Sequence, residues 1–174
     1  MISTGQLIPT HQLHLLHSQL AAELTPEWGM GACWYAAAHA CQRLRARGIT
    51  TSYCQGWVIE EECGSTYAVA HGFLMTPRGQ VVDPHHHLLD LNPRWVVVNR
   101  WSYSALELHL SMARGSVRGG LPIGFHLHPD AMPDDCPRYR HILREALVAD
   151  GTDPAEIQLS DGTTCCAPAS QPLS

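Results

Sequence analysis

The spacing of apolar residues along this 174-residue chain predicts four helices. Residues 11–24 carry apolar side chains at near-helical intervals, and Thr25-Pro26 should end this helix because the residue before a proline is forced out of the helical region. Residues 33–47 should form a second helix, rich in alanine and arginine, that stops at Gly48. Two further helices are expected over residues 103–114 and 139–149. The second helix should bury a stripe formed by Trp34, Ala37, Cys41 and Leu44.

Alternating and β-branched segments predict the strands. Residues 49–60 and 66–76 should pair around a turn at Glu61–Ser65, and the tight turn Pro77–Gln80 leads into a short strand at 81–83. Two more strands are expected at 94–101 and 121–128, with a flexible break over 115–120 before the last one. Helices beside antiparallel strands predict an α+β fold.

Length and composition indicate one domain followed by a tail. Residues 1–151 are long enough to bury a core, and 45% of the whole chain is hydrophobic. Residues 152–174 are rich in proline, serine, threonine and alanine, which predicts a loosely ordered C-terminal tail.

Charge and cysteine usage exclude several classes of function. The formal net charge of −5 offers no basic field for a phosphate backbone, so we expect no nucleic-acid partner. Residues 1–20 lack the basic and apolar regions of a signal peptide, and no segment approaches membrane-spanning length. Seven cysteines in irregular spacing favour reduced thiols over a disulfide framework, which predicts a cytoplasmic protein.

The strongest chemical candidate is Cys33, at the predicted start of the second helix. Unpaired backbone N–H groups and the positive end of the helix dipole favour a thiolate there, and a thiolate is the form that attacks a carbonyl carbon. The alternative is that Cys33 is one more small buried hydrophobe.

A cysteine nucleophile needs a base and a group that holds the base, and His71 and Asp83 occupy neighbouring predicted strands. Counting outward from Arg78-Gly79 pairs Leu74 with Asp83, so His71 lies three residues beyond the partner of Asp83. A bulge or a shifted register would bring the two side chains together. Otherwise His71 is a core histidine and Asp83 belongs to an Asp-Pro turn.

The ordered set resembles the transglutaminase-like superfamily of papain-fold enzymes. Gly31-Ala32-Cys33-Trp34 is similar to the sequence around the papain nucleophile, but papain-like proteases keep their histidine more than ~100 residues downstream. Here His71 follows Cys33 by 38 residues and Asp83 follows His71 by 12, a compact order that resembles the transglutaminase-like enzymes. The other resembling segments are Leu44–Ile49, Tyr53–Val58, Ala70-His71-Gly72-Phe73 and Val82-Asp83-Pro84.

This resemblance implies a papain-like fold in which the nucleophile helix packs on an antiparallel sheet. It makes Cys33 the nucleophile, His71 the base and acid, and Asp83 the residue that orients the histidine. The expected reaction is acyl chemistry on an amide or isopeptide bond through a thioester, as in a cysteine peptidase, an amidase or an acyltransferase. The substrate would be a peptide, a protein or a small amide, and no cofactor is required.

The oxyanion of such a reaction needs two hydrogen-bond donors. One should be the backbone N–H of Cys33. Papain-like proteases place a glutamine six residues before the cysteine, and that position is Glu27 here, which accepts rather than donates at neutral pH. Trp28 is the substitute donor that we consider, and Trp34 is a second candidate for contact with the oxyanion or the substrate.

Two other interpretations stay open. His85-His86-His87, with His126, His128 and Asp130, are ligand types for Zn²⁺ or a similar ion, although three consecutive histidines cannot all face one ion from an extended backbone. His11, His14 and His17 are a further row of histidines, which more often forms a solvated helix face. The chain could also be a papain-like binding module without activity, because Glu27 replaces the glutamine and His-Gly replaces the family's His-Ala.

Overall fold

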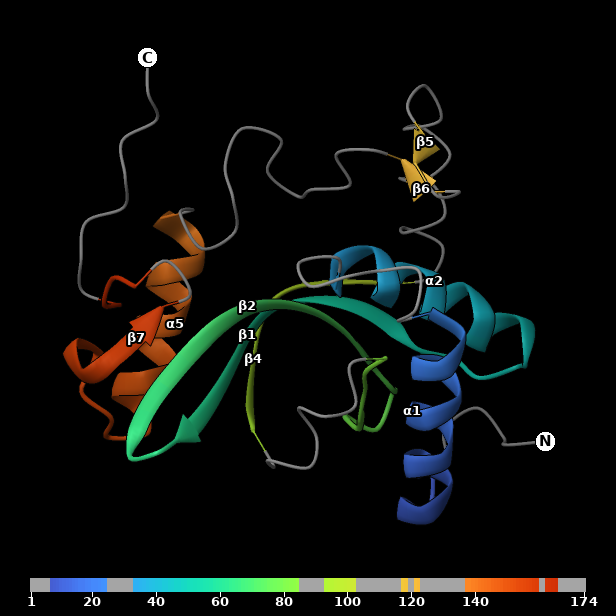
Figure 1. The fold of residues 1–174 in the computed structure, drawn as a ribbon, viewed down its shortest axis with the longest axis horizontal. Coiled ribbons are helices and arrows are strands. Elements are labelled where there is room, and N and C mark those ends of the chain that lie inside the picture. Colours follow the sequence, from blue (N-terminus) through green and yellow to red (C-terminus); the bar gives the residue numbers. More distant parts are fainter. Residues whose placement is uncertain are drawn as a thin grey trace. The chain divides into compact units, whose positions relative to one another are not determined.

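The computed structural model describes residues 7–24, 33–84, 93–102, 117–118, 121–122, 137–159 and 162–165, and these form an α+β protein (Figure 1). The helices are α1 (Thr10–Leu24), α2 (Cys33–Ala46), α5 (Pro137–Ala149) and the 3-10 turn η1 (Pro154–Glu156). The strands are β1 (Ser52–Glu62), β2 (Ser65–Met75), β3 (Val81–Val82), β4 (Arg94–Trp101), β5 (Val117–Arg118), β6 (Leu121–Pro122) and β7 (Ile157–Leu159). The α+β class is therefore confirmed. The helix expected at 103–114 lies outside the described residues.

Within the described residues, the larger sheet has the order β3-β2-β1-β4, and β7 also pairs with β2. A two-residue turn, Cys63-Gly64, joins β1 to β2, and both residues have positive φ, 52° and 81°. That combination is the type I′ turn, whose backbone twist matches the twist of paired strands. The turn is shorter than the expected Glu61–Ser65, because Glu61 and Glu62 continue strand β1.

The second hairpin has a different register from the one expected. The Thr76 N–H donates to the Gln80 carbonyl oxygen at 2.9 Å, and Gly79 has a φ of 81°. Three residues therefore form the loop, with glycine in the left-handed position of a bulged hairpin. The pairing is Leu74 with Val82 and Met75 with Val81, one residue away from the count made around Arg78-Gly79.

Helices α2 and α5 end by the same local device. The N–H of Gly48 donates to the Arg45 carbonyl at 3.0 Å, and the next N–H, of Ile49, donates to the Leu44 carbonyl at 2.9 Å. With Gly48 at a φ of 76°, this is the Schellman arrangement. Gly151 and Thr152 repeat it at the end of α5, with bonds of 3.0 and 2.9 Å. The predicted helix stop at Gly48 is confirmed.

The chain groups into two compact units, and each has its own core. The first unit comprises Met1–Gln55, Gly72–Asp90 and Asn99–Phe125. In it α1 lies beside α2 (Figure 1), and their apolar faces pack with Tyr53, Leu74 and Val82. The predicted stripe of α2 is buried throughout. On α1, Leu16 and Leu20 are buried but Leu15 is exposed.

The second unit comprises Gly56–His71, Leu91–Val98 and His126–Ser174. Its helix α5 packs through Tyr139, Leu143 and Leu147 against apolar side chains of β1, β2, β4 and β7. The buried Trp57 donates its indole N–H to the Tyr139 carbonyl at 3.0 Å, which joins the sheet to the first turn of the helix.

The loosely ordered tail expected from residue 152 does not begin there. Residues 157–159 form β7, which pairs in parallel with Thr66, Tyr67 and Ala68 of β2. Cys165 is fully buried, and Arg144 donates to its carbonyl oxygen at 3.2 Å. Pairing with an existing strand supplies hydrogen bonds that composition does not reveal. The flexible break expected at 115–120 likewise contains β5, which pairs with β6. None of the described helices has the length and apolar character needed to cross a bilayer.

Candidate active site

Cys33 is the first residue of α2, as predicted, and 8% of it is exposed. The other described cysteines differ from it in position: Cys41, Cys54 and Cys165 are buried away from any helix start, and Cys63 is exposed in the type I′ turn. Burial raises the pKa of the Cys41 thiol, although a hydrogen bond with Thr51 and the charge of Arg45 act to lower it. Burial also raises the pKa of the Cys54 thiol, to about 12. Cys41 and Cys54 are therefore protonated thiols at neutral pH.

Strand β2 passes directly against the first turn of α2 at Gly72. A Cβ atom on Gly72 would lie 2.8 Å from Cε3 of Trp34, 3.0 Å from Cα of Trp34 and 3.2 Å from the carbonyl oxygen of Cys33. Only a residue without a side chain leaves these atoms undisturbed. The glycine in His71-Gly72 thus has a packing role that the sequence pattern alone did not explain.

His71 precedes Gly72 on β2 and is 5% exposed. Its ring lies 6.1 Å from the ring of Trp95, centroid to centroid, at an angle of 47°. Successive side chains of a regular strand point to opposite faces. Gly72, rather than His71, therefore has the strand position that faces the first turn of α2.

Asp83 follows β3 directly and is fully buried. Continuing the observed pairing by one residue places Asp83 opposite Phe73. His71 lies two residues before Phe73, so a regular strand gives those two residues the same face. His71 therefore lies two residues beyond the partner of Asp83, instead of the three expected from the sequence.

The remaining candidates divide between described and undescribed parts of the chain. Trp34 is 7% exposed and contacts the Gly72 position, while Trp28 and Glu27 lie outside the described residues. His85-His86-His87, His126, His128 and Asp130 also lie outside them. Within the described part of the chain, no three His, Cys, Asp or Glu side chains group as metal ligands.

The row of histidines at positions 11, 14 and 17 lies on helix α1. His11 and His14 are exposed, as expected of a solvated helix face, but His17 is buried.

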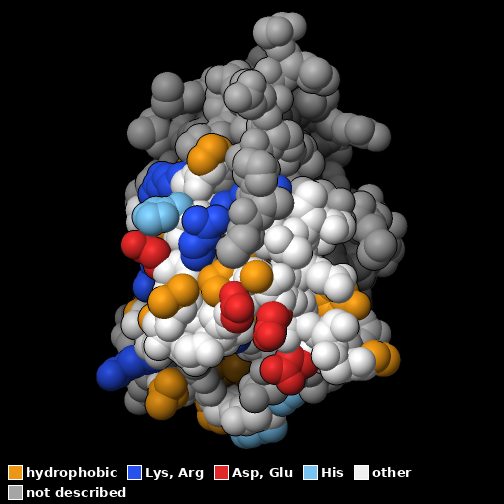
Figure 2. All heavy atoms as spheres, turned by 90° about the vertical axis from the view of Figure 1, so that its left-hand side faces the viewer, with side chains coloured by type: hydrophobic (Ala, Val, Ile, Leu, Met, Phe, Trp, Pro, Cys, Tyr) orange, Lys and Arg blue, Asp and Glu red, His pale blue; other side chains and the backbone are white. Residues whose placement is uncertain are grey.

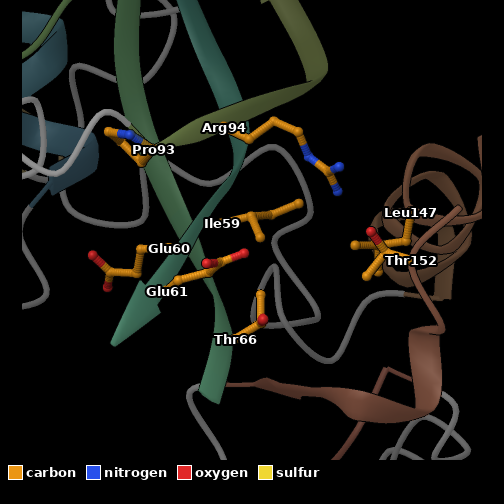
Figure 3. Close-up of a pocket in the computed structure, with 8 residues that line it drawn as sticks. All are labelled: Ile59, Glu60, Glu61, Thr66, Pro93, Arg94, Leu147 and Thr152. Carbon is orange, nitrogen blue, oxygen red and sulfur yellow. The ribbon is translucent and has the colours of Figure 1, made fainter. Parts of the chain in front are cut away.

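Sequence reasoning missed a cavity in the second unit. Its lining includes Glu61 near the end of β1 and Arg94 at the start of β4, two opposite charges on the same hollow (Figure 3). Nothing in the local sequence pattern pairs these two residues, which are 33 positions apart in the chain.

Comparisons with protein-family models, curated proteins and solved structures find no match to this chain.

Proposed function

We propose that this protein is a thiol-dependent acyl-transfer enzyme with a papain-like, transglutaminase-like fold. Cys33 is the nucleophile, His71 the base and acid, and Asp83 the residue that holds the imidazole in one tautomer. The described cysteines are all free thiols, which agrees with a reducing cytoplasm.

The observation that carries the proposal is the contact between β2 and the start of α2. The Gly72 backbone lies against the Cys33 carbonyl and Trp34, so the residue next to His71 in the chain touches the residue of the nucleophile. Cys33 also has a helix-start position, beside backbone N–H groups that have no partner within the helix, which Cys41, Cys54 and Cys165 lack. Asp83 adds a fully buried carboxyl group one residue beyond the paired strand β3.

In the proposed reaction the Cys33 sulfur attacks the carbonyl carbon of an amide. The tetrahedral oxyanion accepts a hydrogen bond from the Cys33 backbone N–H. The C–N bond then breaks, the amine leaves with the proton held by His71, and a thioester remains on Cys33. Water or a second amine attacks the thioester, its proton passes to His71, and the C–S bond breaks to regenerate the thiolate.

Alkylation by iodoacetamide at neutral pH tests the proposal with peptide-resolved mass spectrometry. Cys33 should react faster than Cys63, although Cys63 is exposed and Cys33 is 8% exposed, because the proposed base His71 would activate the sulfur of Cys33 alone. Cys41 and Cys54 should stay unmodified, since burial keeps them protonated. The variant His71→Ala should slow the labelling of Cys33 and leave that of Cys63 unchanged. A Cys33 rate no higher than the Cys63 rate would refute the proposal.

A second function, a papain-like binding module without catalysis, is favoured by the alternation along β2. Because Gly72 has the strand position facing α2, a regular strand directs His71 to the other face, where its ring meets Trp95. Under this alternative, His71→Ala lowers stability and does not change the labelling rate of Cys33. Measuring both the rate and the free energy of unfolding in the same variant separates the two functions.

A further inference from the structure

An open groove of about 330 Å³ runs along helix α1 in the first unit. Its lining comes from α1 and from the segment that follows α2, and it includes Gln12, Leu15, Gln19, Arg47 and Ile49. None of the proposed catalytic residues lines this groove. Any role that it has is therefore separate from the chemistry proposed for Cys33.

Contacts within the chain hold the walls of this groove in place. Ile8 and Leu16 also line it, and they are only 3% and 7% exposed. The Ile8 N–H donates to Oε1 of Gln80 at 2.8 Å, and the Ile8 carbonyl oxygen accepts from Nε2 of the same side chain at 2.7 Å. Arg47 forms an ion pair with Glu23 of α1. The groove is therefore a preformed feature of the folded chain.

Leu15 is an exposed apolar side chain on this groove. The large hydrophobic residues that are exposed in the described part of the chain are Leu7 (64%), Leu15 (59%) and Val148 (61%). Val148 lies on α5, and Figure 2 shows the face over α5 with apolar side chains scattered among basic and acidic groups. Leu15, in contrast, adjoins apolar surface, and such a surface is typical of an interaction site.

The charges at the groove favour a second copy of this chain as the occupant. Arg47 is the charged residue among those that line it, and the ion pair with Glu23 neutralises it. The chain as a whole has a formal net charge of −5, so two copies repel each other where acidic surfaces meet. At this neutral face two copies can approach without that cost.

The sequence of α1 is nearly symmetric along this face. The segment reads Gln12-Leu13-His14-Leu15-Leu16-His17-Ser18-Gln19, in which only Leu13 and Ser18 depart from the symmetry. Gln12, Leu15 and Gln19 repeat at helical spacing and are all exposed, so they form one row on the helix. In two antiparallel copies related by a two-fold axis, Gln12 lies opposite Gln19. An amide both donates and accepts, so the two side chains can pair.

We propose that α1 binds α1 of a second copy of this chain, antiparallel, about a two-fold axis near Leu15. Each Leu15 side chain enters the groove of the other copy, against Leu16 and Ile49. Each Gln12 amide exchanges hydrogen bonds with Gln19 of the second copy. Both copies use the same surface, so the assembly closes as a dimer.

Sedimentation velocity of the full chain measures the association. The range should run from about 1 μM to about 1 mM, because one pair of helices makes a small interface and a weak dimer. A reducing agent prevents cross-linking through the exposed Cys63. The parent protein should shift from monomer to dimer as its concentration rises.

A matched pair of variants locates the interface. Leu15→Glu should weaken the dimer tenfold or more, because it places two like charges close to the two-fold axis. Val148→Glu is the control, since Val148 is equally exposed but lies on α5, and it should change the association less than twofold. Circular dichroism checks that both variants are folded.

Two double variants test the antiparallel arrangement and also decide the question if Leu15→Glu does not fold. Gln12→Glu with Gln19→Arg places opposite charges against each other in the antiparallel pair, so the dimer should persist. Gln12→Glu with Gln19→Glu places like charges there and should weaken the dimer tenfold or more. In a parallel pair, both double variants would place like charges together.

Three results would overturn the proposal. The first is a parent protein that stays monomeric over the whole range, which would mean that the groove serves a different partner. The second is a Leu15→Glu variant that associates as the parent does, and the third is equal association of the two double variants. Labelling of Cys33 plays no part in these measurements, so the outcome is independent of the acyl-transfer proposal.

Discussion

Replacing Gly72 with alanine should destabilise the protein by about 1–2 kcal/mol, because the new Cβ enters the contact between β2 and α2. The added atom would lie 2.8 Å from Trp34 Cε3, 3.0 Å from Trp34 Cα and 3.2 Å from the Cys33 carbonyl oxygen. Overpacking of this kind typically costs ~1–3 kcal/mol. The lower entropy of the unfolded alanine chain offsets about 0.4–1 kcal/mol of that cost.

Urea unfolding followed by tryptophan fluorescence measures this change. The midpoint should fall while the m-value stays the same, because the surface exposed on unfolding is unchanged. Gly48→Ala is a contrasting variant: its Cβ would touch nothing, and its cost of roughly 1–2 kcal/mol arises from the left-handed φ of 76° instead. A Gly72→Ala protein as stable as the parent would refute the close approach.

A double-mutant cycle identifies the atoms responsible. Trp34→Leu removes Cε3, the nearest atom, so adding Gly72→Ala to it should cost less than adding Gly72→Ala to the parent. The expected coupling is about 0.5–1.5 kcal/mol, within the range for residues in contact. Full additivity would mean that the backbone of α2, and not the indole ring, resists the new methyl group.

Three further predictions concern stability. Gly56→Ala should lower the free energy of unfolding by more than the ~1–3 kcal/mol of ordinary overpacking, because its Cβ would lie 1.9 Å from the Val96 carbonyl oxygen. The measurement is urea unfolding, or the yield of folded protein if the variant does not fold. Cys63→Asn should raise stability by ~0.5–1 kcal/mol, measured as a higher melting temperature, because asparagine suits the first position of a type I′ turn, where φ is 52°. Stability should fall as pH rises from 9.0 toward about 12, since the folded state keeps Cys54 protonated while the unfolded state releases the proton. Cys54→Ala should reduce that slope by up to ~1.4 kcal/mol per pH unit in unfolding measurements, and an unchanged slope would contradict the assignment.

The parts of this fold that the sequence determines are those set by local backbone chemistry. Gly48 and Gly151 end α2 and α5 because only glycine adopts their positive φ without strain. The run Val96-Val97-Val98 forms β4 over the predicted residues 94–101, and Cys33 opens its helix as expected. Each of these features depends on neighbours within a few positions in the chain.

The tertiary structure alone decided the features that depend on distant partners. The loop that contains Gly79 is one residue longer than the sequence predicted. This difference shifts the pairing of β2 with β3 by one residue, and with it the face on which Asp83 lies. Ile157–Leu159 became a strand because β2 offered a free edge, although composition predicted a loose tail. The cavity between Glu61 and Arg94 has the same origin, since strands that are adjacent in space bring together residues that no local pattern connects. Local propensities therefore determine where helices and strands form, and pairing between distant segments determines which side chains come into contact.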